Sequence, residues 1–263
     1  MNTPLPTLAE ITRDGRRLPI PAETTDEITY SLFIPCYGEE KNVVHVIEKI
    51  VQVTRELNAS YEILVFDDHS KDRTVDVVRD YQSAHPEVPV RLFVNSRNRG
   101  VARNFIEGAF QGRGRYYRIV MGDDVESVET IKTVLSLAGQ AEIIIPYHTS
   151  VEGKPWHRMM ISRFYTQLVN LASNRRLRYY NGSPLFLRRD AMRFHVEATG
   201  LGFQAEFLLR LLQEGRSFME VAVKASDREG STSLNLRNFV SVAYSLLKIL
   251  GRRLSGQRSY MRD

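Results

Sequence analysis

The sequence lacks several features that mark other classes of protein. It has a single cysteine, Cys36, so no internal disulfide framework can form and a reduced, cytoplasmic location is the default expectation. It has no apolar run of about 20 residues, so no segment is expected to span a bilayer. Residues 1–27 show neither the apolar core of a signal peptide nor helical periodicity, and we expect a mobile lead-in there.

Motifs of three common nucleotide-binding and nucleic-acid-binding classes are also missing. The first expected strand is followed by PCYGEE, which is not the G-x-G-x-x-G of dinucleotide-dependent oxidoreductases. A phosphate loop ending in Gly-Lys-Ser/Thr is absent. Neither a zinc-ligand spacing nor an aromatic-glycine RNA signature accompanies the arginines, so no nucleic acid partner is expected.

The sequence does contain an ordinary hydrophobic core and an uneven distribution of charge. Its 263 residues are 43% hydrophobic, which suits one large α/β domain, and the formal net charge is +5. Many arginines lie in the second half: Arg158, Arg163, Arg175, Arg176, Arg178, Arg188, Arg189, Arg193, Arg252 and Arg253. This bias favours an anionic partner, such as phosphate on a small molecule or a lipid.

From residue 28 onward, short apolar runs alternate with amphipathic segments, which is the pattern of βαβ units and a largely parallel sheet. The predicted strands are 28–35, 61–68, 90–95, 116–121, 141–146, 184–188 and 217–225. The predicted helices are 39–57, 72–83, 100–112, 126–137, 156–174, 202–215 and 234–254. We therefore predict a doubly wound α/β fold with helices on both faces of the sheet.

Adjacent carboxylates follow the fourth predicted strand, where the sequence reads RIVMGDDVES. Ligands of open α/β sheets bind beyond the carboxyl ends of the strands. Asp123 and Asp124 repel each other unless a cation offsets their charge, and Mg²⁺ or Mn²⁺ completed by a diphosphate would do so. An N-cap role for Asp124, before a helix that starts near Glu126, is equally consistent with the pattern.

A second acidic pair, Asp67 and Asp68, follows the second predicted strand in FDDHSKDRT. Carboxylates in this position can accept hydrogen bonds from a nucleotide base or ribose. The alternative is a turn in which Asp72 caps the next helix. Two such pairs after two strands of one sheet favour a binding site over two unrelated turns.

The segments IPCYGEEKNV, VFDDHSKDRT, NRGVARNFIEG and VMGDDVES, in this order and spacing, resemble the nucleotide-binding half of family-two glycosyltransferases. The resemblance is closest to the branch of dolichyl- and polyprenyl-phosphate sugar transferases, and it covers roughly residues 28–250. It implies the A-type (GT-A) fold. The implied glycosyltransferase domain, 28–233, has a nucleotide-sugar half, 28–146, and an acceptor half, 147–233.

The resemblance implies an inverting transfer of a hexosyl group from a UDP- or GDP-linked sugar. The implied donor-binding residues are Pro35, Tyr37, Glu39, Asp67, Asp68 and Asp123. Asp124, with Asp123, would hold Mg²⁺ or Mn²⁺, which stabilises negative charge on the departing diphosphate. Arg228 would add further positive charge beside the same diphosphate.

The second half resembles the acceptor side of the same branch. The implied acceptor-binding residues are Arg158, Ser162, Asn181, Gly182, Glu206 and Ser231, with Arg158 also in the catalytic set. The alternative for each of these residues is an ordinary role as a surface charge or as a residue that a turn requires. A lipid phosphate is already ionised near neutral pH and needs no general base, and the lack of an acceptor-side Asp in residues 147–189 favours it.

One departure from the family pattern leaves alternatives open. Relatives carry Asp-X-Asp after the fourth strand, and here Gly122 stands in place of the first aspartate. Dependence on a metal is therefore less secure than in a chain with the full motif. Two alternatives to a lipid-phosphate acceptor remain: transfer to a sugar hydroxyl of a glycan, and a non-catalytic protein that binds a sugar nucleotide.

The last segment, 234–263, is predicted as a basic amphipathic helix and tail. Its apolar residues lie among Arg237, Lys248, Arg252 and Arg253, which suits peripheral attachment to the anionic inner face of a membrane. A core-packed helix with a basic outer edge is the alternative. A role in cell-envelope glycan synthesis would follow, with a membrane protein as a further candidate partner.

Overall fold

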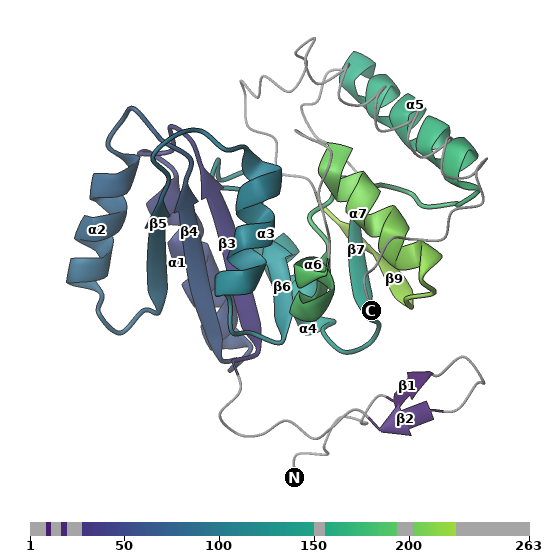
Figure 1. Ribbon diagram of the computed structural model, residues 1–263, viewed down its shortest axis with the longest axis horizontal. Coiled ribbons are helices and arrows are strands. Elements are labelled where there is room, and N and C mark those ends of the chain that lie inside the picture. Colours follow the sequence, from purple (N-terminus) through teal and green to yellow (C-terminus); the bar gives the residue numbers. More distant parts are fainter. Residues whose placement is uncertain (1–8, 12–16, 20–27, 150–155, 194–201, 225–263) are drawn as a thin grey trace.

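The computed structural model describes residues 9–11, 17–19, 28–149, 156–193 and 202–224. A seven-stranded sheet with the order β5-β4-β3-β6-β8-β7-β9 forms the centre of the fold (Figure 1). Its strands are β3 Tyr30–Cys36, β4 Tyr61–Asp67, β5 Val90–Val94, β6 Tyr116–Ile119, β7 Ile143–His148, β8 Leu185–Leu187 and β9 Phe218–Val223. Two short strands within the predicted lead-in, β1 Ala9–Ile11 and β2 Arg17–Pro19, pair antiparallel.

The sheet is parallel on the side that carries the acidic turns. β5, β4, β3 and β6 run in one direction, so their carboxyl ends lie at one edge, where Cys36 pairs with Asp67 and Asp67 with Val94. β8 lies between β6 and β7 and is antiparallel to both, and β7 is parallel to β9. The predicted doubly wound, mostly parallel sheet is confirmed.

The helices follow the predicted alternation: α1 Val43–Glu56, α2 Thr74–Ala84, α3 Val101–Gln111, α4 Val128–Ser136, α5 Trp156–Ser173, α6 Arg188–Met192 and α7 Gly202–Gln213. The short helix α6 was not predicted, because its five residues are too few to show a helical period. The predicted helix at 234–254 lies outside the described residues.

Alternate residues of the strands serve the two faces of the sheet. Leu32 and Ile34 of β3 belong to the apolar cluster that includes α1, α2 and α4, whereas Phe33 belongs to the cluster that includes α3 and α7. Figure 1 shows α3 in front of the sheet and α1 behind it. The fold is therefore three-layered, with two cores separated by the sheet.

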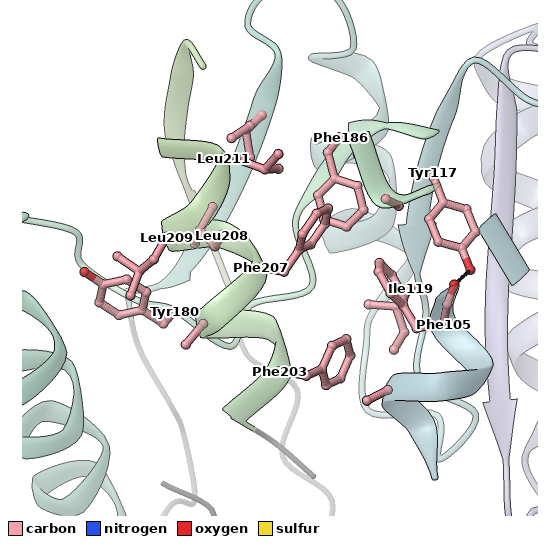
Figure 2. Close-up of a cluster of buried hydrophobic side chains, with 14 of the residues drawn as sticks. Phe105, Tyr117, Ile119, Tyr180, Phe186, Phe203, Phe207, Leu208, Leu209 and Leu211 are labelled. Carbon is pink, nitrogen blue, oxygen red and sulfur yellow. Dashed lines mark hydrogen bonds between the residues drawn. The ribbon is translucent and has the colours of Figure 1, made fainter. Parts of the chain in front are cut away.

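An aromatic cluster joins the two halves of the domain (Figure 2). Phe105 of α3 lies at its centre, with ring centroids 5.0–5.8 Å from four other rings, those of Tyr117, Phe186, Phe203 and Phe207. The Tyr117 hydroxyl donates to the Phe105 carbonyl at 2.7 Å. Since a fully buried side chain of this size contributes about 1.5–3 kcal/mol, this cluster fixes α7 and β8 firmly against the parallel half of the sheet.

Candidate active site

The two acidic turns are neighbours across the end of β3. Asp67 pairs in register with Cys36, the last residue of β3. On the other side of that strand, a Cβ placed on Gly122 would lie 3.1 Å from the Cys36 sulfur and 3.5 Å from Cγ of Glu39. Burial raises the pKa of the Cys36 thiol, and the nearby carboxylates of Glu39 and Asp67 raise it further. Residues from three strand ends therefore form one acidic edge.

Asp67 presents a buried carboxylate with an open acceptor. Its side chain is 1% exposed, and Oδ2 accepts a hydrogen bond from the Ser70 backbone N–H at 3.1 Å. Oδ1 is buried and has no hydrogen-bond partner among the residues that the structure describes. An unsatisfied buried oxygen is costly, so a ligand hydroxyl or N–H group at this point would be stabilised.

Asp68 is held by the loop that leads into α3. Its Oδ1 accepts from the Arg99 backbone N–H at 2.7 Å and from Asn95 Nδ2 at 2.9 Å, and its Oδ2 accepts from the Gly100 N–H at 2.8 Å. Burial raises the pKa of this carboxyl, but these hydrogen bonds outweigh burial and the net pKa is lowered. Asp68 therefore shapes the loop, and its predicted contact with the donor stays a prediction.

The loop after β3 is fastened to the segment after β4. Three backbone N–H groups donate to side chains there: Gly38 to Ser70 Oγ at 3.0 Å, Glu39 to Thr74 Oγ1 at 2.8 Å and Glu40 to Asp72 Oδ2 at 3.1 Å. Gly38 has φ +78°, a conformation that favours glycine. The fixed loop presents the ring of Tyr37, which is 58% exposed. An exposed aromatic ring on a rigid loop can stack on a flat base.

The N-cap residue of α4 tests the interpretation of Asp124 as a helix cap. The helix begins at Val128, and its N-cap is Ser127, whose hydroxyl accepts from the Thr130 N–H at 3.2 Å. The alternative in which Asp124 caps a helix that starts near Glu126 is therefore wrong. Ser127 has the preferred extended backbone of a cap residue, which the sequence pattern alone did not distinguish.

Asp124 faces a lysine that the sequence analysis did not single out. Nζ of Lys49, on α1, lies 2.7 Å from Oδ1 of Asp124 and donates to the Glu126 carbonyl oxygen at 3.0 Å. The two side chains are 26% and 22% exposed, so the ion pair is largely shielded. Asp124 has φ +63°, a left-handed conformation that Asp tolerates better than most residues.

Gly122 is required by the packing of the strand ends. A Cβ on this residue would lie 2.6 Å from the carbonyl oxygen of Pro35, which is backbone and cannot move aside easily. An aspartate in this position would therefore clash with β3. The departure from Asp-X-Asp is thus built into the geometry of this chain, and Asp123 and Asp124 are the carboxylates that remain in the motif.

A buried arginine supports the same turn. Arg118 of β6 is 0% exposed; its Nη2 donates to Glu126 Oε2, and its Nε donates to the Ser183 carbonyl at 3.1 Å. It therefore connects the turn after β6 with the loop before β8. The sequence indicates that Arg118 has a special role, because a charged residue inside the apolar run YYRIVM is buried and needs a partner.

The acceptor-side predictions fall partly on described residues. Gly182 lies where a Cβ would be 2.2 Å from the Pro146 carbonyl oxygen, so close contact with β7 requires glycine there. Asn181 precedes it in the loop. Glu206 is buried in α7 and forms an ion pair with Arg210 at 2.7 Å. The structure thus gives Gly182 and Glu206 packing roles, and their contacts with an acceptor stay predictions.

Four predicted residues are not described by the structure in the detail a site requires. Arg158 and Ser162 lie in α5, but their side chains are outside the described part of the chain. Arg228 and Ser231 lie outside the described residues altogether. Their predicted roles are therefore not tested by the geometry.

The acidic edge offers carboxylate oxygens to a hard cation such as Mg²⁺, whose remaining ligands would come from a bound diphosphate. Within residues 28–149, 156–193 and 202–224, no group of three or more His, Cys, Asp or Glu side chains is placed to hold a metal ion. Asp123 and Asp124 are adjacent oxygen donors on one turn. Mg²⁺ is commonly bound by one or two carboxylates together with substrate phosphates, so the residues fit an ion that arrives with a diphosphate.

Comparison with known proteins identifies the family. The sequence pattern described as glycosyl transferase family 2 matches residues 31–196, which include both acidic turns. The chain belongs to glycosyl transferase family 2. This enzyme is therefore a glycosyltransferase, and the resemblance drawn from its strand-end motifs is confirmed.

Two curated relatives cover most of the glycosyltransferase. Dolichyl-phosphate beta-glucosyltransferase of Dictyostelium discoideum is 24% identical over 252 residues, which covers 88% of this chain and 76% of that protein. Undecaprenyl-phosphate 4-deoxy-4-formamido-L-arabinose transferase of Proteus mirabilis (strain HI4320) is 22% identical over 225 residues, covering 84% and 67%. The family 2 glycosyltransferase is thus related to sugar transferases named for polyprenyl-type lipid phosphates.

Solved structures establish the fold of the enzyme. Glucosyl-3-phosphoglycerate synthase from Mycobacterium tuberculosis, in complex with Mg²⁺ and UDP, has a TM-score of 0.64 at 16% identity, with 85% of this chain and 80% of that chain covered. Mannosyl-3-phosphoglycerate synthase from Rubrobacter xylanophilus has a TM-score of 0.62 at 15% identity, with 90% and 77% covered. The predicted GT-A fold is confirmed.

Proposed function

We propose that this enzyme transfers a sugar from a UDP- or GDP-linked donor to a polyprenyl phosphate, with inversion at the anomeric carbon. The observation that carries the proposal is the pair of relatives matched over 84–88% of this chain, one named for dolichyl phosphate and one for undecaprenyl phosphate. The donor side receives support from the described residues, and the acceptor side from the charge pattern of the sequence.

The proposed donor lies on the acidic edge. The buried Oδ1 of Asp67 offers an acceptor to a base N–H or a ribose hydroxyl, and the exposed ring of Tyr37 offers a stacking surface. Glu39 and Pro35 complete this end of β3. Nucleotide binding at this edge agrees with the general rule for ligands of open α/β sheets.

The proposed diphosphate lies beside the turn after β6. Asp124 and Asp123 would hold Mg²⁺ or Mn²⁺, which supplies positive charge against the departing diphosphate when it is bound. The M. tuberculosis synthase, which has the same fold, was crystallised with Mg²⁺ and UDP. Arg228 remains the predicted second source of positive charge.

The proposed acceptor side is basic and contains no carboxylate over a long segment. Residues 153–189 include no Asp or Glu, and their cations are Lys154, Arg158, Arg163, Arg175, Arg176, Arg178, Arg188 and Arg189. A phosphate monoester is attracted by such a segment. Ser162, Asn181, Gly182, Glu206 and Ser231 remain the other predicted acceptor residues.

The proposed reaction needs no proton transfer by the protein. An ionised phosphate oxygen of the lipid forms a bond to the anomeric carbon as the bond from that carbon to the diphosphate oxygen breaks. The electron pair leaves with the nucleoside diphosphate. The positive character that develops on the sugar is the feature common to glycosyl transfer. The task of the protein is therefore to align the two anions and to screen their charge.

A lipid acceptor also requires access to a membrane surface, and we propose peripheral attachment on the cytoplasmic side. Among the described helices, none combines the length and the apolar character needed to cross a bilayer. The basic helix predicted at 234–254 would provide attachment through anionic lipids.

A comparison of acceptors, each supplied separately, tests the proposal. The purified enzyme is incubated with UDP-glucose or GDP-mannose, Mn²⁺ and one acceptor: undecaprenyl phosphate in detergent, 3-phosphoglycerate, or a free disaccharide. We expect release of the nucleoside diphosphate and formation of a sugar-phospholipid with the lipid phosphate only. Transfer to either hydroxyl acceptor instead, or binding of the donor with no transfer to any acceptor, would contradict it.

A further inference from the structure

Among the described residues, the cation nearest to the proposed metal ligand Asp124 is a lysine of the protein itself. Lys49 projects from α1 and places Nζ 2.7 Å from Oδ1 of Asp124. Besides this ion pair, Nζ donates a hydrogen bond to the Glu126 carbonyl oxygen at 3.0 Å, which holds the ammonium group at the turn after β6. Lys49 lies in none of the four strand-end motifs.

Two further features make this ammonium group important for cation binding. The clash at Pro35 excludes a side chain at Gly122, so the motif lacks its usual first aspartate, and the other carboxylate of the turn, Glu126, is paired with Arg118. Lys49 places a charge of +1 against the −1 of Asp124, so it offsets the charge of one of the two adjacent aspartates. A bare divalent cation therefore meets a turn whose Asp124 already has a positive partner.

We propose that Lys49 is the built-in counter-ion of Asp124 and that it makes binding of the divalent cation depend on the nucleoside diphosphate. The proposal rests on the proposed function, because it assumes a diphosphate donor. Without the donor, a metal ion must bind next to an ammonium group or displace it. With the donor, the diphosphate supplies negative charge to both cations, and Lys49 gains a second anionic partner.

Coupling of this kind is reciprocal. If the diphosphate strengthens metal binding, the metal must strengthen binding of the diphosphate by the same factor. Removal of the Lys49 charge should therefore weaken the coupling from both directions. The metal would bind more tightly alone, and the nucleotide would add less to its affinity.

The first experiment measures binding of Mn²⁺ alone, by the loss of the electron paramagnetic resonance signal of the free ion. The variants are wild type, Lys49→Met, Lys49→Gln and Lys49→Arg, with thermal melting to establish that each is folded. An opposite charge in direct contact lowers the proton affinity of a carboxylate by about tenfold or more. We expect a similar effect on Mn²⁺, so Lys49→Met and Lys49→Gln should bind it about tenfold more tightly than wild type. Lys49→Arg should bind as weakly as wild type.

Lys132→Met is the matched control. Lys132 of α4 forms an ion pair with Glu56 of α1 at 2.6 Å, so it is another lysine pair that involves α1. Its removal should leave the Mn²⁺ affinity unchanged. An equal gain in Lys132→Met would show that the effect is one of overall charge, and it would overturn the proposal.

The second experiment repeats the titration with UDP and, separately, with GDP. In wild type, the nucleotide that binds should raise the Mn²⁺ affinity by a larger factor than it does in Lys49→Met. Unchanged or weaker Mn²⁺ binding in both Lys49→Met and Lys49→Gln would overturn the role of Lys49. If wild type binds no nucleoside diphosphate or sugar nucleotide, the proposed function itself fails, which is a different result.

Discussion

Adjacent carboxylates lie near the end of β4 and in the turn after β6, but the protein stabilises the two pairs differently. Asp68 accepts hydrogen bonds from two backbone N–H groups and from the amide of Asn95. Asp124 faces the ammonium group of Lys49 at the end of a long side chain. Backbone donors move only when the loop moves, whereas a lysine can rotate away. The first turn is therefore a fixed part of the site and the second is able to exchange its partner.

Replacement of Asp124 should have the largest effect on catalysis. Asp124→Asn keeps the shape and the tolerance for a positive φ but removes the negative charge. We expect the transfer rate to fall about 100-fold or more, as for the loss of a charge-stabilising group in other active sites, while the melting temperature stays close to that of wild type. Steady-state rates at saturating donor check this. A variant with full activity would contradict the role of Asp124.

Restoration of the usual motif at Gly122 should damage the fold. Gly122→Asp places a Cβ 2.6 Å from the Pro35 carbonyl oxygen, and we expect a loss of about 2–3 kcal/mol in the free energy of unfolding from this overpacking. Urea denaturation measures it. Gly122→Ala is the matched variant, because it adds the same Cβ without a carboxylate and should lose a similar amount of stability if the clash with Pro35 is the cause. Equal stability of Gly122→Asp and wild type would refute the packing explanation.

Replacement of Asp68 should lower the free energy of unfolding more than it affects the transfer reaction. Asp68→Asn turns one acceptor oxygen into a donor that faces existing N–H donors, and we expect a loss of about 2 kcal/mol in the free energy of unfolding. The loop at 95–100 should also exchange its amide hydrogens faster. A stability equal to that of wild type, with normal amide exchange, would mean that the loop does not depend on this carboxylate.

The pH dependence of stability tests the role of Asp68 through a smaller effect. The pKa of Asp68 is lowered in the folded state because the hydrogen bonds outweigh burial. Its contribution is therefore complete above the unfolded pKa of about 3.9 and is lost as the pH falls through the folded pKa. The difference in unfolding free energy between wild type and Asp68→Asn should be constant near neutral pH and should shrink below about pH 4. A difference that grows in acid would contradict this assignment.

Much of the fold could be predicted from the sequence because the apolar runs and helical periods are strong. The strand at 184–188 was predicted, but its position between β6 and β7 was not, since periodicity does not encode the order of strands. Helix α6 was too short to predict. The cap at Ser127 was missed because Asp124 is also a good cap residue and lies only three positions earlier.

The candidate site was predictable only where the sequence groups its residues. Asp67, Asp68, Asp123 and Asp124 occur in pairs after strands, and parallel strands bring such pairs to one edge. Lys49 comes from the middle of an amphipathic helix, where a lysine is ordinary, and only the packing of α1 beside the turn reveals its partner. The requirement for glycine at position 122 likewise depends on a tertiary contact with Pro35.

The most direct test of the central claim is a crystal structure with Mn²⁺ and the nucleoside diphosphate that binds, using the anomalous signal of manganese. The account predicts a manganese peak at Asp124, the base against Tyr37, and a hydrogen bond from the nucleoside to Asp67. A nucleotide bound away from the ends of β3, β4 and β6, or manganese bound elsewhere with Asp124 still paired to Lys49, would contradict it.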